Sequence, residues 1–415
     1  MNDWKADLAD LTLFEGGAPW KSFERLRRED PVHWTPEPQP NRGFWSITRH
    51  ADIVRVERDV ESFSSEVGAV ALEELDEDQL VIRRSMLETD GARHMALRRL
   101  IQRDFSARQL AGYESFLRTL TRSTLEAALP QRRFDFVKEV SADFPIRVLV
   151  RLLGVPDDDA DQLISWGNRM IGNTDPEYAD VLADSKDSDA YRELPFRSPA
   201  ALEVFNYGRA LAADRRGGEG EDLVSKLVNR VPEDGTPLSE RDFDNYFLLL
   251  VVAGNETTRH AISHTLKALI DYPDQLRRLQ GNPELIPGAV DEFLRWASPV
   301  YQFRRTATRE VELGGRRIGV GDKVVIWFAS GNRDEDIFEE PNRFDVGRRG
   351  VDHLTFGKGG PHFCLGSALA KLELRVIFEE LVARVSAVRA VGPSRYVRSN
   401  FIHGIKTLPI EVDLY

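Results

Sequence analysis

The sequence predicts a mainly α-helical protein with a smaller β-rich part, and three stretches of the chain support this prediction. One apolar helical run extends from Ser239 to about Asp271, and a second begins at about Gly366. Residues 311–328 contain short alternating strands around glycine turns, which is the pattern of β-hairpins. Apolar residues repeated every three or four positions indicate buried helices, whereas strict alternation indicates strands. The helical runs are the longer elements, so helices should dominate the fold.

Composition limits the classes of function. The chain has 415 residues, 41% of them hydrophobic, which is enough for a large core, and its length alone would allow two domains. Acidic residues outnumber basic ones by 68 to 56, which argues against nucleic acid as a partner. The first residues do not resemble a signal peptide, and the apolar run Tyr246–Gly254 is shorter than the about 20 residues that cross a bilayer. We therefore expect a cytoplasmic protein with no membrane span, and the single cysteine fits a reducing compartment.

The N-terminal part of the chain alternates between short elements and irregular segments. Residues 1–40 are expected to be an irregular lead-in with one helix near Pro19–Glu29. The β-rich stretch Gly43–Thr48 predicts the first strand of a small sheet, and Ala51–Asp59 predicts a helix. Residues 64–90 are acidic and lack periodicity, so we expect a solvated loop there.

The middle of the chain is helical and is interrupted by one aperiodic segment. Residues 112–171 predict helices that break near Gly154. Residues 172–199 are rich in Asp, Ser and Pro, as expected for a linker or a mobile surface segment. Ser239 then begins the long run with Asp242 three positions later, a helix-capping pattern. About 30 residues at 1.5 Å each give about 45 Å, which is enough to cross a domain.

The centre of this long helix carries an unexpected group of polar residues. The run up to Val252 is apolar on all sides and should be buried, yet Ala253-Gly-Asn-Glu-Thr-Thr258 follows it directly. A carboxylate, two threonines and a glycine are locally unfavourable in mid-helix. A threonine there often only bonds the carbonyl of the preceding turn.

Cys364 is the only cysteine of the chain, so it forms neither an internal disulfide nor a multi-cysteine metal site. It lies in Phe356-Gly-Lys-Gly-Gly-Pro-His-Phe-Cys-Leu-Gly366, directly before a helix. A helix N-terminus lowers the pKa of a thiol, and glycines at 357, 359 and 360 would let amides point at the sulfur. The ordinary alternative is a small buried apolar side chain.

This loop resembles the haem-ligand loop of the cytochrome P-450 family, in which Phe, Gly-x-Gly, a basic residue, Cys and Gly recur in this order. The resemblance implies that Cys364 is the axial ligand of a haem iron, with Phe356, His362 and Gly366 beside the cofactor. Phe356 lies eight residues before Cys364, one more than in most members. Similar longer loops occur in members that oxidise sterol side chains and branched lipids.

The resemblance assigns further residues to haem binding and oxygen activation. It implies that His94 and Arg98, four residues apart on one helix face, bind a haem propionate together with Arg305 and His362. Without the resemblance, such a basic pair would be interpreted as ordinary solvent-exposed charge. Ala253 would flank the haem and Gly254 would let the helix widen beside it. The implied acid–alcohol pair is Glu256, connected to a proton supply, and Thr257, near dioxygen.

A third set is implied to be structural. Glu292 and Arg295 match the family's buried Glu-x-x-Arg pair, with Arg343 as the expected third member. Taken alone, an acid and a base three residues apart in a helix are common and weakly stabilising.

The resemblance covers nearly the whole chain and implies the cytochrome P-450 fold. This is one domain, residues 1–415, shaped as a triangular prism with a β-rich lobe from about 40–60 and 300–330. Haem b would lie between the long central helix and the cysteine-loop helix. The implied activity is a monooxygenase that hydroxylates a small hydrophobic substrate with O2 and electrons from a separate ferredoxin-type donor with its reductase.

The substrate is less defined than the reaction. Ala253–Arg259, the longer cysteine loop and the stretch 399–406 resemble members that act on sterols and methyl-branched lipids, with terpenoids as a second class. The pocket residues expected from family position are Val70, Val252, Ala253, Val300, Tyr301 and Phe401. A haem-thiolate peroxygenase or isomerase without a redox partner, and a non-catalytic haem sensor, are the alternatives.

Overall fold

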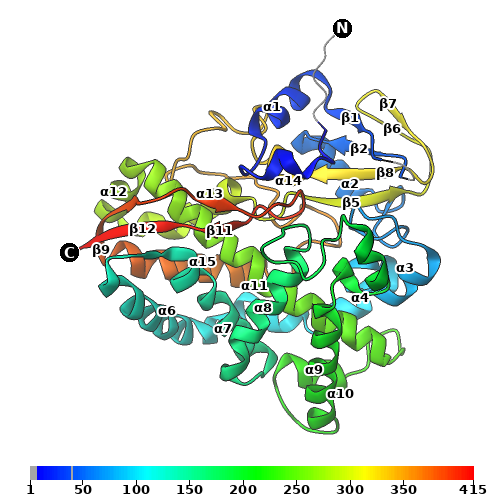
Figure 1. Ribbon diagram of the computed structural model, residues 1–415, viewed down its shortest axis with the longest axis horizontal. Helices are drawn as coiled ribbons and strands as arrows, with labels where there is room; N and C mark the ends of the chain where they lie inside the picture. Colours follow the sequence, from blue (N-terminus) through cyan, green and yellow to red (C-terminus); the bar gives the residue numbers. More distant parts are fainter. Residues whose placement is uncertain (1–6, 39–40) are drawn as a thin grey trace.

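The computed structural model describes residues 7–38 and 41–415 (Figure 1). Residues 1–6, 39 and 40, which belong to the expected lead-in and the edge of the expected β-rich lobe, lie outside the described residues. Helices make up the larger part, and the main sheet lies to one side of them, at the upper right of the view (Figure 1). The predicted class, mainly α with a smaller β-rich part, is confirmed.

The α-helices follow the chain from the N-terminal segment to the cysteine-loop helix. They are α1 Trp20–Glu29, α2 His50–Arg58, α3 Glu77–Arg83, α4 Gly91–Arg99, α5 Ala107–Leu110, α6 Glu114–Ala128, α7 Asp143–Leu153, α8 Ala160–Ile171, α9 Ala200–Arg215, α10 Leu223–Asn229, α11 Glu240–Asp271, α12 Pro273–Gly281, α13 Ile286–Ala297, α14 Phe328–Gly331 and α15 Ser367–Val382.

The strands form one larger and three smaller sheets. They are β1 Val32–Thr35, β2 Phe44–Ile47, β3 Phe63–Ser64, β4 Arg133–Asp135, β5 Gln302–Ala307, β6 Val311–Leu313, β7 Arg316–Ile318, β8 Lys323–Trp327, β9 Val385–Ala390, β10 Arg395–Tyr396, β11 Ile405–Thr407 and β12 Pro409–Leu414. The five-stranded sheet has the order β1-β2-β8-β5-β3, with β2 and β8 parallel and the other pairs antiparallel. The smaller sheets are β4-β12-β9, β10-β11 and β6-β7.

Helix α11 is the central element of the fold. Ser239 caps it as predicted, because its side chain accepts from the amide of Asp242 while Asp242 bonds back to the amide of Ser239. The helix packs against α7, α8, α9, α13 and α15, so most of its 32 residues are buried. Gly208 of α9 lets that helix approach closely, since a Cβ at this position would lie 2.7 Å from the ring of Phe247. Neither α11 nor any other helix of the described residues contains a stretch apolar enough to span a membrane.

Three hydrophobic clusters hold the elements together. The largest surrounds α11 and joins the helices to the C-terminal strands. The second lies between α2 and the five-stranded sheet, and the third joins α1 and the segment before it to the opposite face of that sheet.

The structure differs from the sequence expectations, or goes beyond them, at three elements. The segment 64–90 is not a plain loop, because it contains α3 with a capping box at Asp76 and Gln79. The helix that carries His94 and Arg98 ends at Arg99, and a short 3-10 turn follows at Gln102–Phe105. The sheet β4-β12-β9 was not predicted: its strands lie far apart in sequence and pair only after the chain has folded.

Candidate active site

The cysteine loop is held against α2 by Glu57. The amide of Cys364 donates to the carbonyl oxygen of Phe356 (2.8 Å), which closes the loop. The amide of Lys358 donates to Glu57 Oε2 (2.7 Å), and a Cβ at Gly357, whose φ is 73°, would lie 2.6 Å from Glu57 Oε1. A Cβ at Gly360 would collide with the carbonyl of Glu57. These glycines thus serve close packing on α2, not the predicted wrapping around the sulfur.

The amides near the Cys364 sulfur come from the start of α15. Burial raises the pKa of the Cys364 thiol, and the amides of Gly366 and Ser367 and the charge of Arg98 oppose this only in part. The amides at the helix N-terminus therefore act on the thiol as predicted. The predicted net lowering of its pKa is wrong for the free thiol, because the effect of burial is larger. A coordinating metal ion would remove this proton outright.

Four predicted propionate ligands lie around the cysteine loop. His94, Arg98 and Arg305 are all buried, so the pair His94 and Arg98 on α4 is not a solvent-exposed basic pair. The rings of His94 and His362 lie 4.1 Å apart between centroids, His94 Nε2 is 3.2 Å from the carbonyl of Pro361, and Arg98 Nη2 donates to the carbonyl of Phe363 (2.6 Å). Arg305, on β5, faces the carboxylates of Glu57 and Asp90. The structure brings these side chains to one side of the loop.

His362 has unused hydrogen-bonding capacity. Both of its ring nitrogens are buried without a hydrogen-bond partner, although Nε2 lies 3.5 Å from Asp90 Oδ1. Burial lowers the pKa of His362 to about 4, which Asp90 opposes only in part. A buried polar atom without a partner costs free energy, so a ligand that pairs with this imidazole would be favoured.

One stripe of α11 is open in an otherwise buried helix. Ala253 is exposed, and Leu249 and Thr257, four residues before and after it, are half-buried. The Thr257 hydroxyl donates to the carbonyl of Ala253 (3.0 Å), so its lone pairs can still accept a hydrogen bond. Residues four apart share one helix face, and this face can therefore adjoin a cofactor or substrate.

Gly254 has a role other than the predicted one. The structure keeps α11 α-helical from Glu240 to Asp271, so the helix does not widen at this glycine. A Cβ at Gly254 would lie 2.9 Å from Leu149 on α7. The missing side chain thus permits the close crossing of α7 and α11.

Glu256 directly precedes Thr257 on α11 and, unlike it, is buried among hydrogen-bond donors. Its Oε1 accepts from Asn255 Nδ2 and Arg259 Nη1, both at 3.1 Å, and its Oε2 lies 3.4 Å from His260 Nε2. Burial acts to raise the pKa of Glu256, but Arg259 and His260 outweigh it and lower the pKa below its usual value. Glu256 is therefore an ionised carboxylate held by this chain's own side chains.

The predicted structural trio is correct in two members. Arg295 forms a bidentate pair with Glu292 at 2.6 and 2.8 Å, and both side chains are completely buried. Arg343 is wrong as the third member, because its side chain lies at the surface and pairs with Glu340. Arg348 Nε instead lies 3.2 Å from Glu292 Oε2. Only the backbone carbonyl of Arg343 takes part, accepting from Arg295 Nη2.

The expected pocket residues divide into two groups. Ala253 lies at the open stripe of α11 and Val252 beside it is buried in the largest cluster, while the carbonyl of Val70 accepts from the amide of Arg304. Val300 and Phe401 pack as half-buried side chains at the edge of the largest cluster. Tyr301 packs in the third cluster instead, where its ring lies 5.1 Å from Phe14 and 4.9 Å from His403 between centroids. This placement does not support Tyr301 as a pocket residue, because neighbouring strand residues face opposite sides.

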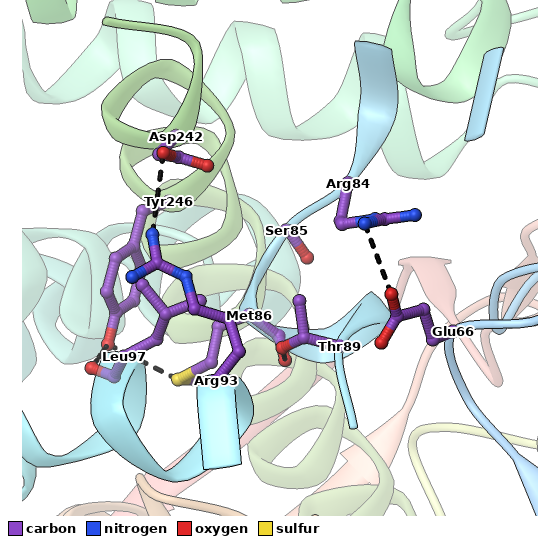
Figure 2. Close-up of a pocket in the computed structure, with 9 residues that line it drawn as sticks. All are labelled: Glu66, Arg84, Ser85, Met86, Thr89, Arg93, Leu97, Asp242 and Tyr246. Atoms are coloured by element: carbon purple, nitrogen blue, oxygen red, sulfur yellow. Dashed lines mark hydrogen bonds and ion pairs between the residues drawn. The ribbon is translucent and has the colours of Figure 1, made fainter. Parts of the chain in front are cut away.

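A separate cavity of about 280 Å³ lies between the segment 64–90, α4 and α11 (Figure 2). Ion pairs join its walls: Arg93 lies 3.5 Å from Asp242, and Arg84 lies 3.1 Å from Glu66. Tyr246 extends from α11 towards α4, as Figure 2 shows. Its lining includes no residue of the cysteine loop, so it is distinct from the surroundings of Cys364.

Comparison with known proteins agrees with this geometry. A family model described as Cytochrome P450 matches residues 58–388. Linalool 8-monooxygenase of Pseudomonas putida is 37% identical over 98% of this chain and 98% of its own length. Steroid C26-monooxygenase of Mycolicibacterium smegmatis is 35% identical over 96% of this chain and 92% of its own length. The structure of Mycobacterium marinum cytochrome P450 CYP268A2 in complex with pseudoionone has a TM-score of 0.88 at 36% identity and covers 99% of both chains.

The fold and these matches define an oxidoreductase of the haem-thiolate class. The chain belongs to the cytochrome P450 family and is a P450 monooxygenase. Such enzymes use dioxygen, a hydrophobic substrate and an electron-transfer partner.

The residues present fit a haem. A lone sulfur with two amides directed at it offers one axial ligand, and the unpartnered nitrogens of His362 beside buried arginines suit anionic propionates. The open stripe at Ala253 offers a flat apolar face on α11. Sequence reasoning missed Glu57, which anchors the loop, and Arg348, which completes the buried pair, because neither lies in a local motif.

Proposed function

We propose that the chain is a haem b-dependent monooxygenase that hydroxylates a branched hydrophobic substrate with electrons from a ferredoxin-type protein and its reductase. The observation that carries this proposal is the lone cysteine at the start of α15 together with the acid–alcohol pair at the open stripe of α11. Bound haem supplies the oxygen activation. The chain's own residues supply the ligand, the placement of the cofactor and the protons.

Each site residue has one task in this proposal. Cys364 would bind the haem iron, while His94, Arg98, Arg305 and His362 would hold the propionates. Phe356 and Gly366 shape the surroundings of the sulfur: the ring of Phe356 lies against His353 and Phe363, and a Cβ at Gly366 would lie 4.0 Å from Cys364 Sγ. Ala253, on the open stripe of α11, would lie beside the haem, and Gly254 would keep α11 close to α7.

Proton delivery is the task of Thr257 and Glu256. Thr257 already donates its proton to the carbonyl of Ala253, so its oxygen is free to accept a hydrogen bond from a reacting group or a water. Glu256 is an anion at neutral pH and can take a proton from solvent and pass it on. Thr257 thus serves as a hydrogen-bond acceptor and Glu256, the preceding residue of the same helix, as a proton carrier.

The substrate class follows from relatives and from the apolar stripe. The names of the similar proteins refer to linalool, steroids and pseudoionone. We therefore place the substrate among terpenoids, sterols and branched lipids. The side chains proposed to surround it are apolar, namely Val70, Val252, Ala253, Val300 and Phe401.

The surface around Cys364 supports a separate, acidic electron donor. A cleft of about 910 Å³ on this side is lined by Cys364, Phe363 and the arginines Arg98, Arg99 and Arg103. Phe363 is 42% exposed, so an apolar contact lies beside these arginines, of which Arg99 pairs with Glu233 of the same cleft. A small acidic ferredoxin would be attracted to such a surface and placed near the sulfur.

The first experiment is the absorption spectrum of the reduced protein with carbon monoxide, followed by titration of the ferric form with linalool, a steroid and a fatty acid. A strongly red-shifted Soret band is expected for thiolate ligation, and its loss in Cys364→Ala would assign the ligand. A low-to-high-spin shift with one probe would identify the substrate class. A histidine-type Soret band in the unaltered chain would overturn the proposal.

Thr257→Ala separates the monooxygenase from its alternatives. We expect substrate binding to be retained, product per electron pair to fall by about tenfold, and hydrogen peroxide to appear instead, because a proton acceptor is lost. Thr119→Ala, at an exposed site of α6 where the hydroxyl likewise donates to the carbonyl four residues earlier, is the control. A peroxygenase, isomerase or sensor would show no such change in electron use, and unchanged coupling would remove Thr257 from the mechanism.

A further inference from the structure

Glu256 is contacted by α8 as well as by its own helix. Arg259 Nη1 lies between two acceptors, Glu256 Oε1 at 3.1 Å and Asn168 Oδ1 of α8 at 2.7 Å. Both Arg259 and Glu256 are 2% exposed, so neither charge is balanced by solvent. The shorter contact is with α8, and the position of that helix therefore decides where the guanidinium lies relative to the carboxylate.

Gly167 brings the backbone of α8 directly against the same carboxylate. A Cβ at this position would lie 3.0 Å from Glu256 Oε1 and 3.3 Å from Asn255 Nδ2. Gly167 is buried, and its conformation is helical, so the close approach explains the glycine. A helix interior otherwise favours alanine over glycine by about 1 kcal/mol.

His260 fixes the remaining side of the group. The amide of Ile405, on β11, donates to His260 Nδ1 (3.3 Å), so the neutral ring carries its proton on Nε2, which faces Glu256 Oε2. The charged and titratable groups that face Glu256 are then Arg259 and His260 of α11 and Tyr178 of the segment after α8. None of them accepts a proton from Glu256 in this arrangement.

We propose that Gly167 and Asn168 of α8 are positioning residues for the Glu256 carboxylate, so that α8 forms one wall of the proton-delivery site. This inference rests on the proposed role of Glu256 in the monooxygenase reaction. Asn168 holds part of the Arg259 charge away from Glu256, and Gly167 leaves room for the carboxylate beside Asn255 and Arg259. Helix α8 leads into the segment 172–199, so movement of that segment reaches the acid through these two residues.

The decisive variant is Gly167→Ala, with Gly288→Ala as the matched control. Gly288 lies in α13 and is exposed, and a Cβ added there would meet no atom within 4 Å, so its replacement tests only the effect of an added methyl group in a helix. The readout is the pH midpoint of the infrared carboxylate band that disappears in Glu256→Gln, measured on the holoenzyme.

We expect Gly167→Ala to raise this midpoint by about one pH unit, because displacement weakens a charge-assisted hydrogen bond. Product per electron pair should fall about tenfold with whichever of linalool, steroid or fatty acid gives the spin shift, while its dissociation constant stays unchanged. Gly288→Ala should behave as the unaltered chain. A midpoint in Gly167→Ala equal to that in Gly288→Ala would overturn the inference.

Asn168→Leu gives an independent test at a half-buried position. Without its amide oxygen, Arg259 should turn fully to Glu256 and lower the carboxylate midpoint, opposite in sign to Gly167→Ala. An unchanged midpoint would exclude Asn168 from the site. If Glu256→Gln itself leaves coupling unchanged, the proposed acid role fails, whereas the two midpoints still decide whether α8 positions the carboxylate.

Discussion

The wall behind the cysteine loop and the segment 172–199 use charge in opposite ways. Behind the loop, Glu292 and Arg295 are completely buried and form two hydrogen bonds with each other. Near its end the segment 172–199 is held by a pair that water can reach, Arg197 with Glu73, whose side chains are 20% and 24% exposed, whereas Asp175 at its start is buried against Lys406. Similar ion pairs thus occur in very different surroundings.

The difference concerns what happens when a pair is broken. Separating a buried pair leaves a charge in a medium that cannot solvate it, at a cost of about 3–5 kcal/mol. Separating an exposed pair lets water replace the partner, and the cost is below about 1 kcal/mol. The wall behind the loop should therefore stay fixed, whereas the exposed ion pairs of the segment 172–199 can separate at low cost. Substitutions in the two regions should consequently differ in both stability and kinetics.

The largest effect is expected for Glu292→Gln. The substitution leaves Arg295 buried without a counter-charge, so the free energy of unfolding should fall by about 3–5 kcal/mol, measured by urea unfolding of the holoenzyme. Arg343→Gln is the control, because Arg343 is 57% exposed and pairs only with Glu340, which is 64% exposed. Its effect should be below about 0.5 kcal/mol. An equal loss of unfolding free energy in both variants would contradict the expected difference between buried and exposed ion pairs.

A second prediction concerns pH and the anchor of the cysteine loop. Burial raises the pKa of Glu57 to about 7, while Arg305 and the Lys358 amide oppose the shift. The unfolded chain releases this proton near its ordinary pKa of 4.5, so the stabilisation is present below that value and is lost as pH rises to about 7. A difference of about 2.5 units corresponds to about 3 kcal/mol.

Glu57→Gln should flatten this dependence, because an amide does not titrate. The measurement is the urea midpoint of unfolding between pH 4.5 and 7 for the two proteins. A slope that is the same in both would show that Glu57 is not the group responsible. A flattened slope would show that the wall behind the cysteine loop includes Glu57. This residue lies in α2, far from the loop in sequence, but accepts from the amide of Lys358.

The same contrast explains which parts of the site were predictable. The cysteine loop and the motif Ala253–Thr258 are continuous in sequence, so their residue types and spacing indicate them directly. The capped start of α11 was predictable for the same reason. Arg343 was predicted for a position that Arg348 occupies, because sequence order does not reveal which of two nearby arginines turns inwards.

Contacts between distant segments were not predictable. Asn168 and Glu256 are neighbours only because α8 crosses α11, and the role of Gly254 depends on Leu149 of α7, which the sequence does not place beside it. The net pKa of Cys364 was misjudged for a similar reason, since burial depends on the complete fold whereas a helix N-terminus can be recognised locally.

The smallest effect is expected for the segment 172–199. Glu73 accepts from both Arg83 and Arg197 and thereby ties this segment to the acidic segment 64–90. Glu73→Gln should change the free energy of unfolding by less than about 1 kcal/mol. It should nevertheless speed dissociation of the bound substrate a few-fold in stopped-flow measurements of the spin shift. High salt should reproduce this effect in the unaltered chain, because exposed charges are screened.

Glu310→Gln is the control for this last prediction, since Glu310 forms an exposed pair with Arg317 at the β6-β7 hairpin, away from the segment 172–199. Its dissociation rate should match that of the unaltered chain. If dissociation depends neither on salt-screened pairs nor on Glu73, the segment is held by its apolar contacts instead, and Tyr178, Leu194 and Phe196 become the residues to test. Because those side chains pack on the cluster around α11, opening would then expose apolar surface to water. Dissociation would consequently slow as sulfate is raised, the opposite of what screened ion pairs predict.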